Sequence, residues 1–233
     1  MKTAEKSIPT VNEILSDLDK GSYRVGRHEF LSDVFKCGAI AISNKFDVKN
    51  AEKREKEYLS IIKKYDKKMQ TLIAEIFSKI FILLSGQIYY GFNDYLGELY
   101  MKSETSNSKA GQFFTPYSVS KLCAEMTIDE GTVKEIIKND SIITLNEPAC
   151  GAGGMILAVA DILYDRYNFN ISRNFFAECS DIDERCVIMT YLQLSLVGIP
   201  AVIYQRNTLT METYDRWETP AYIMQWTRFR KYG

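Results

Sequence analysis

The segment IITLNEPACGAGG, residues 142–154, runs from a short apolar stretch into a turn of small residues. The sequence that follows, MILAVADILYDRY, has the apolar spacing of a helix. A strand, a glycine turn and a helix in this order let a ligand approach the backbone, because glycine lacks the Cβ that would block it. Glu147 opens the turn and offers a carboxylate to a ligand cation. The pattern predicts a site of nucleotide size.

Two further apolar runs, residues 174–177 and 201–204, extend this pattern along the chain. Helical stretches are expected at residues 154–167 and 183–197, between the runs. Short strands that alternate with helices are typical of βαβ units, which place helices against a parallel sheet. We therefore expect an α/β fold with three layers and a mostly parallel sheet.

Polar residues follow the second and third of these runs. A lone Gly-x-Gly turn is more often a packing turn, but Asp181 comes at the end of the second strand, where parallel sheets offer acceptors to ribose hydroxyls. Asp183 either accepts from the same ligand as Asp181 does or caps the next helix, and we favour the cap. Asn207 ends the third strand and either hydrogen-bonds an adenine edge or stabilises a turn, which are equally plausible on chemistry alone.

The first hundred residues are helical in pattern and rich in charge. Residues 49–68 carry many lysines, and we favour a solvated helix with paired charges over a surface that follows phosphates. Residues 101–111 are polar and aperiodic, which predicts a linker. We expect a helical domain at 1–110, an α/β domain at 111–213 and an aromatic and basic tail at 214–233. One apolar helix face is expected from Leu72, Ile73, Ile76, Phe77, Ile80, Phe81 and Leu84.

The composition is that of an ordinary globular protein, with 46% hydrophobic and 25% charged residues among 233. A formal net charge of -1 provides no global attraction to nucleic acid, so any DNA contact needs a local patch. The N-terminus lacks the pattern of a secretory signal, and the longest apolar stretch, residues 80–84, is too short to cross a membrane. We therefore expect a cytoplasmic protein without membrane contact.

The five cysteines, at positions 37, 123, 150, 179 and 186, form no C-x-x-C pair, and His28 is the only histidine in the sequence. Structural zinc sites need closely spaced Cys and His pairs. We therefore expect reduced, mostly buried thiols and no metal.

Five segments together resemble the modification (M) subunits of type I restriction-modification systems and related DNA adenine methyltransferases. Residues 111–116, GQFFTP, are similar to the G-Q-[FY]-[FY]-T-P motif, and residues 147–155, EPACGAGGM, to the D-P-[AT]-C-G-[ST]-G-G loop. Asp181 matches the acidic position that binds ribose. Residues 207–209, NTL, resemble the G-[DN]-[ST]-L element beside the adenine, and residues 94–100, DYLGELY, the D-x-L-G-x-x-Y stretch that closes the helical N-terminal domain.

The resemblance implies a partial Rossmann-like methyltransferase domain that binds S-adenosylmethionine. The Thr115 hydroxyl would face the cofactor's carboxylate, and the glycine turn would form the floor under its methionyl part. We expect Phe114, Gly151, Asp181 and Asn207 to line one cavity. The full set implied for the cofactor is Phe113, Phe114, Thr115, Pro116, Glu147, Ala149, Gly151, Gly153, Asp181, Ile182 and Asn207.

Three positions depart from the family pattern. Glu147 stands where Asp is commoner, and Ala152 replaces a usual Ser or Thr. These two changes conserve charge or size. Arg206 replaces a Gly, and this larger change is expected to alter the adenine side of the pocket.

The motif that would transfer the methyl group is missing. Methylation of an exocyclic amino group needs a hydrogen-bond acceptor and an aromatic wall for the flipped base. The family supplies both with [DNS]-P-P-[YFW] after a fourth apolar strand, whereas this sequence contains no Pro-Pro pair. The preceding residues 213–218, TYDRWE, do not read as a buried strand. We expect no catalytic residue, with Thr219, Pro220 and Tyr222 as degenerate candidates.

The sequence ends at Gly233, before the further strands of such enzymes. We therefore expect a three-stranded parallel sheet with an open edge, which is prone to aggregation unless it is covered. Residues 214–232 are expected to pack over that edge or to dock on another protein. Their aromatic and basic side chains could instead stack on single-stranded nucleic acid, but we favour the cover.

Three functions are open at this point. We favour an S-adenosylmethionine-binding, DNA adenine methyltransferase-like protein of a restriction-modification system, weak or inactive alone, that reaches DNA indirectly or with partner subunits. The second is an active methylase with a degenerate or partner-supplied catalytic loop. The third is a non-enzymatic interaction module or decoy of the M subunit.

Overall fold

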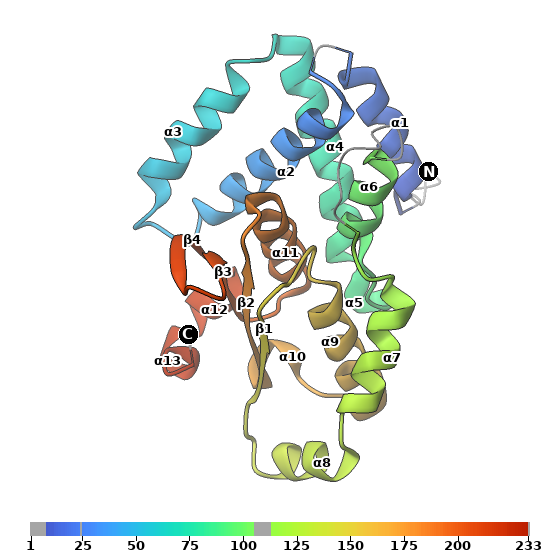
Figure 1. Ribbon diagram of the computed structural model, residues 1–233, viewed down its shortest axis with the longest axis vertical. Helices are drawn as coiled ribbons and strands as arrows, with labels where there is room; N and C mark the ends of the chain where they lie inside the picture. The colour runs from blue at the N-terminus through green and yellow to red at the C-terminus, as the bar shows by residue number, and fades with distance from the viewer. Residues whose placement is uncertain (1–7, 24, 105–112, 233) are drawn as a thin grey trace, which may run out of the picture.

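An open four-stranded sheet organises the second half of the chain in the computed structural model, which describes residues 8–23, 25–104 and 113–232 (Figure 1). The strands are β1 (Ile143–Glu147), β2 (Phe175–Asp181), β3 (Ala201–Asn207) and β4 (Glu212–Glu218), in the order β1-β2-β3-β4. The first three strands are parallel, and β4 is antiparallel to β3. The mixed α/β fold with a mostly parallel sheet is therefore confirmed, with four strands where we expected three.

Helices connect the parallel strands on one side of the sheet. These helices, with those that lead into the sheet, are α7 (Tyr117–Thr127), α8 (Glu130–Lys138), α9 (Gly154–Tyr167), α10 (Ile171–Asn174) and α11 (Glu184–Val197). The predicted helix at 154–167 is confirmed, and so is the capping role of Asp183, whose Oδ1 accepts from the Arg185 amide at 2.9 Å. Alternate residues of β2, such as Phe175 and Ala177, face these helices in the main core.

The first hundred residues form helices that cover α11. They are α1 (Val11–Gly21), α2 (Arg27–Ser43), α3 (Ala51–Ile62), α4 (Lys67–Ser85), α5 (Gln87–Tyr90) and α6 (Tyr95–Glu104). Because α2, α4 and α6 pack on α11, that helix lies between them and the sheet, and one hydrophobic core runs through both parts. The division at position 110 stays a prediction. The linker expected from residue 101 is wrong for residues 101–104, which continue α6, and its remainder lies outside the described residues.

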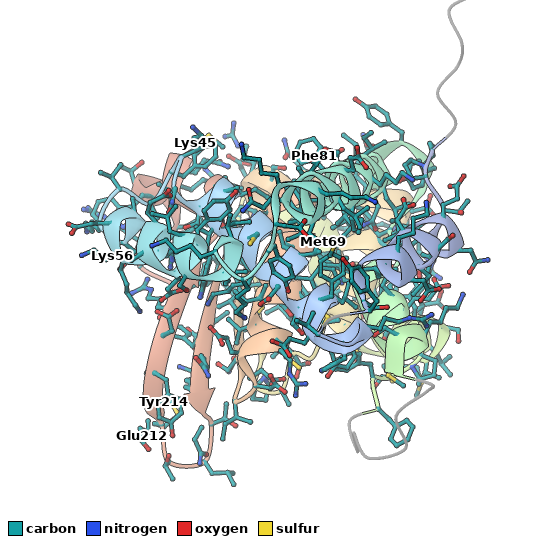
Figure 2. All side chains as sticks on the ribbon, turned by 90° about the horizontal axis from the view of Figure 1, so that it is seen from above. Lys45, Lys56, Met69, Phe81, Glu212 and Tyr214 are labelled. Atoms are coloured by element: carbon teal, nitrogen blue, oxygen red, sulfur yellow. The ribbon has the colours of Figure 1, made fainter. Side chains whose placement is uncertain are left out.

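Helix α4 buries a narrower face than the sequence pattern indicated. Ile73, Ile76 and Ile80 are buried as expected, but Phe81 is 45% exposed and lies on the surface in Figure 2. By length and composition alone, one segment of the described chain, Lys67–Tyr90, could cross a membrane. From the sequence we had considered only the apolar run 80–84, which is too short to do so. The buried residues of Lys67–Tyr90, among them Ile73, Ile76 and Ile80, pack in the main core, where α4 contacts α1, α2 and α11.

Residues 213–218, which we did not interpret as a buried strand, form most of β4, a largely exposed edge strand that pairs along the outer side of β3, so the expected sheet of three strands has a fourth. Charged residues tolerate this position because an edge strand keeps one side in water. Trp217 is its buried anchor. Beyond β4, α12 (Pro220–Met224) and α13 (Trp226–Phe229) pack on the second face of the sheet, where Phe176, Val202, Tyr222 and Phe229 form a small core. The tail thus closes the β3 edge and covers part of a face.

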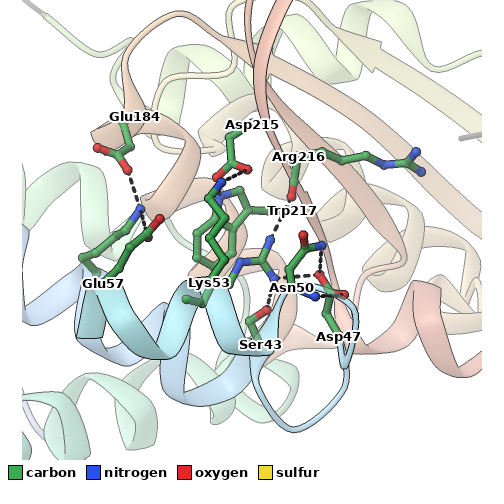
Figure 3. A network of polar contacts seen from close by, with 11 residues as sticks. Ser43, Asp47, Asn50, Lys53, Glu57, Glu184, Asp215, Arg216 and Trp217 are labelled. Carbon is green, nitrogen blue, oxygen red and sulfur yellow. Dashed lines mark hydrogen bonds and ion pairs between the residues drawn. The ribbon is translucent and has the colours of Figure 1, made fainter. Parts of the chain in front are cut away.

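A buried guanidinium joins the helical part to β4 (Figure 3). The Arg54 side chain on α3 is 2% exposed, and its Nη1 donates to the Ser43 hydroxyl and, at 2.7 Å, to Asp47 Oδ2. Its Nη2 donates to the Arg216 carbonyl at 2.8 Å, and its Cζ lies 3.8 Å from the centroid of the Trp217 ring. Lys56 and Glu52 on the same helix form an exposed pair, as expected, but the sequence pattern did not distinguish Arg54 from its exposed neighbours.

Replacement of Arg54 by alanine is expected to lower the free energy of unfolding by about 3–5 kcal/mol, because Asp47 would keep a buried charge without its partner. Urea denaturation followed by circular dichroism measures this change. Lys56→Ala on the same helix is the matched control, since Lys56 makes an exposed pair with Glu52 and should leave the unfolding midpoint in place. Equal midpoints for the two variants would contradict the structural role of Arg54.

Candidate functional site

A cavity of about 190 Å³ lies at the carboxyl end of β1. Three segments far apart in the sequence form its wall: the residue before α6, the residues before α7 with the first turn of that helix, and the turn between β1 and α9. The lining residues are Asp94, Phe113, Phe114, Thr115, Ser120, Glu147, Ala149, Cys150, Gly151, Ala152, Gly154 and Met155. Polar and apolar groups therefore meet at one concave site, which is typical of small-molecule binding.

The glycine turn forms one side of this cavity with a backbone that requires glycine. Gly151 has φ +54° and Gly153 has φ +96°, both in the left-handed region. A Cβ at Gly151 would lie 3.1 Å from Phe114 Cδ1. The Thr190 hydroxyl on α11 donates to the Gly151 carbonyl at 2.9 Å, which fixes the turn from behind.

Asp181 supports the turn from the end of β2. Its Oδ2 accepts from the Gly151 amide at 3.0 Å, and its Oδ1 accepts from the Asp183 amide at 2.9 Å. Asp181 itself is not among the residues that line the cavity. The carboxylate is thus adjacent to the cavity and is held by backbone donors.

The end of β3 lies farther from the cavity. Asn207 Oδ1 accepts from the amides of Leu209 and Thr210, at 3.0 and 3.3 Å, which is the turn role that we left open. The Arg206 side chain lies against the sheet, where its guanidinium pairs with Glu178 at 2.7 Å and lies over the Tyr204 ring. The hairpin between β3 and β4 extends away from the body, with Glu212 and Tyr214 near its tip (Figure 2).

The structure brings together about half of the residues that the sequence indicated. Phe113, Phe114, Thr115, Glu147, Ala149 and Gly151 line the cavity. Of the four residues expected to share one cavity, Phe114 and Gly151 do so, Asp181 contacts Gly151, and Asn207 is absent from the lining. The residues outside the lining are Pro116, Gly153, Asp181, Ile182 and Asn207.

Outside the glycine turn, two polar residues of the cavity lining were not predicted from the sequence. Asp94 lies in the segment DYLGELY, which we noted without giving the carboxylate a role, and Ser120 follows the GQFFTP segment, whose first two residues lie outside the described ranges. Nothing in the spacing of either residue reveals that it reaches the glycine turn. Only the packing of α6 and α7 beside α9 and α11 brings them there.

Thr219, Pro220 and Tyr222 lie at the opposite end of the sheet. The Thr219 hydroxyl accepts from the Ala201 amide at 2.9 Å and donates to the Ile199 carbonyl at 2.8 Å, at the amino end of β3. A strand of seven residues is about 20 Å long, which separates this corner from the cavity. Thr219 caps α12, and Tyr222 packs on Phe176. The three residues have structural roles there.

The thiols near the cavity are poor nucleophiles. Burial raises the pKa of Cys150, Cys179 and Cys186, so each remains a protonated thiol at neutral pH. Four of the cysteines are buried as expected, whereas Cys123 on α7 is exposed.

Comparison with known proteins supplies the family. The sequence model for N-6 DNA methylase matches residues 91–231. The chain belongs to this family. No curated protein matches the sequence at a significant level.

One solved structure resembles the fold, a protein of Listeria monocytogenes described as a class I S-adenosylmethionine-dependent methyltransferase. It shares 16% sequence identity and a TM-score of 0.44, over 85% of this chain. The chain spans about half of that protein, 54% of its length.

Membership in the N-6 DNA methylase family confirms the cofactor predicted from the sequence, S-adenosylmethionine. The residues present fit the methionyl part of this cofactor. A Cβ would fill the space above Gly151, and two carboxylates and a threonine hydroxyl from the chain line the same cavity.

Gly151→Val is expected to abolish S-adenosylmethionine binding, because a branched side chain would strain the left-handed backbone and meet Phe114. Isothermal titration calorimetry with the purified chain measures the loss. Asp165→Ala is the control, because this residue lies on the exposed side of α9 outside the cavity and should leave the affinity unchanged. An unchanged affinity of the Gly151 variant would remove the glycine turn from the site.

Proposed function

We propose that this protein is the S-adenosylmethionine-binding part of an adenine-specific DNA modification system, with little or no methyl transfer by itself. One observation carries the proposal: the glycine turn, the residues before α7 and two carboxylates converge on one cavity at the carboxyl end of β1. In doubly wound sheets, ligands bind at this end of the strands. Membership in the N-6 DNA methylase family supports the same ligand.

The cofactor is proposed to lie with its methionyl part in the cavity. Phe114 would cover it, the Thr115 hydroxyl would donate to its carboxylate, and Gly151 would give it room. The ribose is proposed to lie toward Asp181, whose carboxylate is adjacent to the turn. Ile182, which is exposed, and Asn207 would then be on the adenine side, outside the cavity of the methionyl part. The bound cofactor supplies an activated methyl group.

The target side of the site is proposed to be incomplete. The residues that line the cavity include no amide side chain next to an aromatic residue, which is the pairing in the family's catalytic motif. Thr219 and Tyr222 lie at the other end of the sheet. A transfer reaction needs an acceptor for the amino hydrogens of the target base and a surface on which to stack it. We therefore infer weak transfer by this chain alone.

One feature favours the second candidate function, an active methylase whose catalytic loop comes from a partner subunit. Within the described residues, β1 pairs only with β2, so its outer edge keeps unpaired backbone donors and acceptors beside the cavity. A strand added there in parallel would place its carboxyl end next to Glu147. We propose that this protein acts in the cytoplasm, together with partner subunits of a restriction-modification system that bind DNA.

Methyl transfer to DNA tests the proposal directly. The purified chain is expected to bind S-adenosylmethionine in calorimetry and to transfer no labelled methyl group to adenine in double-stranded DNA above background. Binding followed by robust turnover would defeat the claim of low activity and leave the cofactor site standing. A failure to bind the cofactor would defeat the whole proposal and favour a non-enzymatic interaction module.

Asp181→Ala is expected to weaken S-adenosylmethionine binding by about 1–3 kcal/mol, because the carboxylate would no longer receive ribose hydroxyls or hold the Gly151 amide. In titration calorimetry this corresponds to an increase in Kd of about 5- to 150-fold. Asp165→Ala, on the exposed side of α9, is the matched control and should bind as the wild type does. Wild-type affinity in the Asp181 variant would place the ribose elsewhere.

A further inference from the structure

A buried carboxylate from the helical part of the chain reaches the cofactor cavity. Asp94 precedes α6, is 7% exposed, and lines the cavity together with the glycine turn. A Cβ at Gly154 would lie 2.9 Å from Asp94 Oδ2, so the glycine at the start of α9 leaves the room that this oxygen occupies. The carboxylate therefore forms a side of the cavity that the β1–α9 turn does not supply.

The orientation of this carboxylate is fixed by two donors on one of its oxygens. Asp94 Oδ1 accepts from the Gly97 amide at 2.9 Å and from Gln193 Nε2 at 2.7 Å. Gln193 Nε2 also donates to the Ala152 carbonyl at 2.7 Å, which ties the carboxylate to the glycine turn. Both donors are neutral. They leave Oδ2 directed toward the start of α9.

Asp94 lacks a cationic partner in the part of the chain that the structure describes. The contrast is Asp161 on α9, which is 6% exposed and pairs with Lys121 at 2.7 Å. A buried carboxylate without a cation is costly, because neutral hydrogen bonds replace only part of its hydration. Burial accordingly raises the pKa of Asp94 above its ordinary value. A cation that entered the cavity would remove this cost.

We propose that Asp94 is the counter-ion of the α-ammonium group of S-adenosylmethionine. This assignment rests on the proposed function, which places the methionyl part in the same cavity. An ammonium group donates three hydrogen bonds, and Asp94 Oδ2 offers a charged acceptor inside the cavity. Binding would thus join the residue before α6 to the β1–α9 turn through the ligand.

Two rival pairings are distinguishable by chemistry. Glu147 also lines the cavity, but it is half-buried and its Oε1 already accepts from the Ala149 amide at 3.1 Å. The sulfonium of the cofactor is a second cation that Asp94 could face. S-adenosylhomocysteine has the ammonium without the sulfonium, and 5′-methylthioadenosine has neither group, so the two ligands separate these possibilities.

The test is titration calorimetry of the full chain with all three ligands. Asp94→Asn is nearly isosteric and keeps an acceptor for Gly97 and Gln193. It is expected to raise the Kd for S-adenosylmethionine and for S-adenosylhomocysteine equally, by about 10- to 100-fold, and to leave the Kd for 5′-methylthioadenosine unchanged. The unchanged third affinity shows that the variant is folded around the adenosine end. Asp161→Asn, an equally buried carboxylate outside the cavity, should leave all three affinities unchanged.

Four results would overturn the assignment. A loss confined to S-adenosylmethionine would move Asp94 to the sulfonium, and an equal loss for all three ligands would make its role structural. Wild-type affinities in Asp94→Asn, with the selective loss in Glu147→Gln instead, would give the ammonium to Glu147. A wild-type chain that binds none of the ligands would refute the proposed function itself.

Discussion

The fixed backbone of residues 150–153 is the constraint on which the site depends. The Cys150 amide donates to the Ser180 carbonyl at 2.8 Å, and side chains of Asp181, Thr190 and Gln193 bind the next two residues. These contacts come from β2 and from α11, so the turn is held by two elements that lie later in the chain. Because left-handed glycines can take this path without strain, the turn stays open toward Phe114 instead of filling with its own side chains.

Besides placing Asp94 at the cavity, the helical part of the chain supports the site through α11. That helix is buried on both sides, between the sheet and helices α2, α4 and α6. It carries Thr190 and Gln193, which bind the glycine turn, while Glu184 and Arg185 in its first turn contact Lys36 and His28 of the helical part. Arg54 and Trp217 join the helical part to β4 beside this helix. The position of α11 is thus determined both by the helices packed on it and by this contact with the sheet. A shift of the helical part would therefore move the groups that shape the cavity.

The parallel core could be predicted from sequence, and the parts that depend on distant packing could not. The three parallel strands and the helices α9 and α11 follow from local apolar spacing and glycine position, and the cap at Asp183 follows from residue type. In contrast, β4 has no apolar run that would indicate a strand, because only its Trp217 is buried. It forms a strand by pairing with β3, which local sequence does not reveal. Arg54 and Asp94 are likewise ordinary charged residues in sequence. Their burial arises from contacts with residues about 100 or more positions away.

The sheet is asymmetric in a way that bears on its chemistry. Its β3 edge is closed by an antiparallel strand, and the second face is covered by α12 and α13 only near Phe176 and Val202. Its β1 edge, next to the cavity, pairs with nothing in the described ranges. The groups that line the cavity are thus built into the core, where they are held by many contacts, whereas the β1 edge has no such support within the described residues. Under the proposed function, this separation lets one chain hold the methyl donor while a second determines whether, and on which base, it is used.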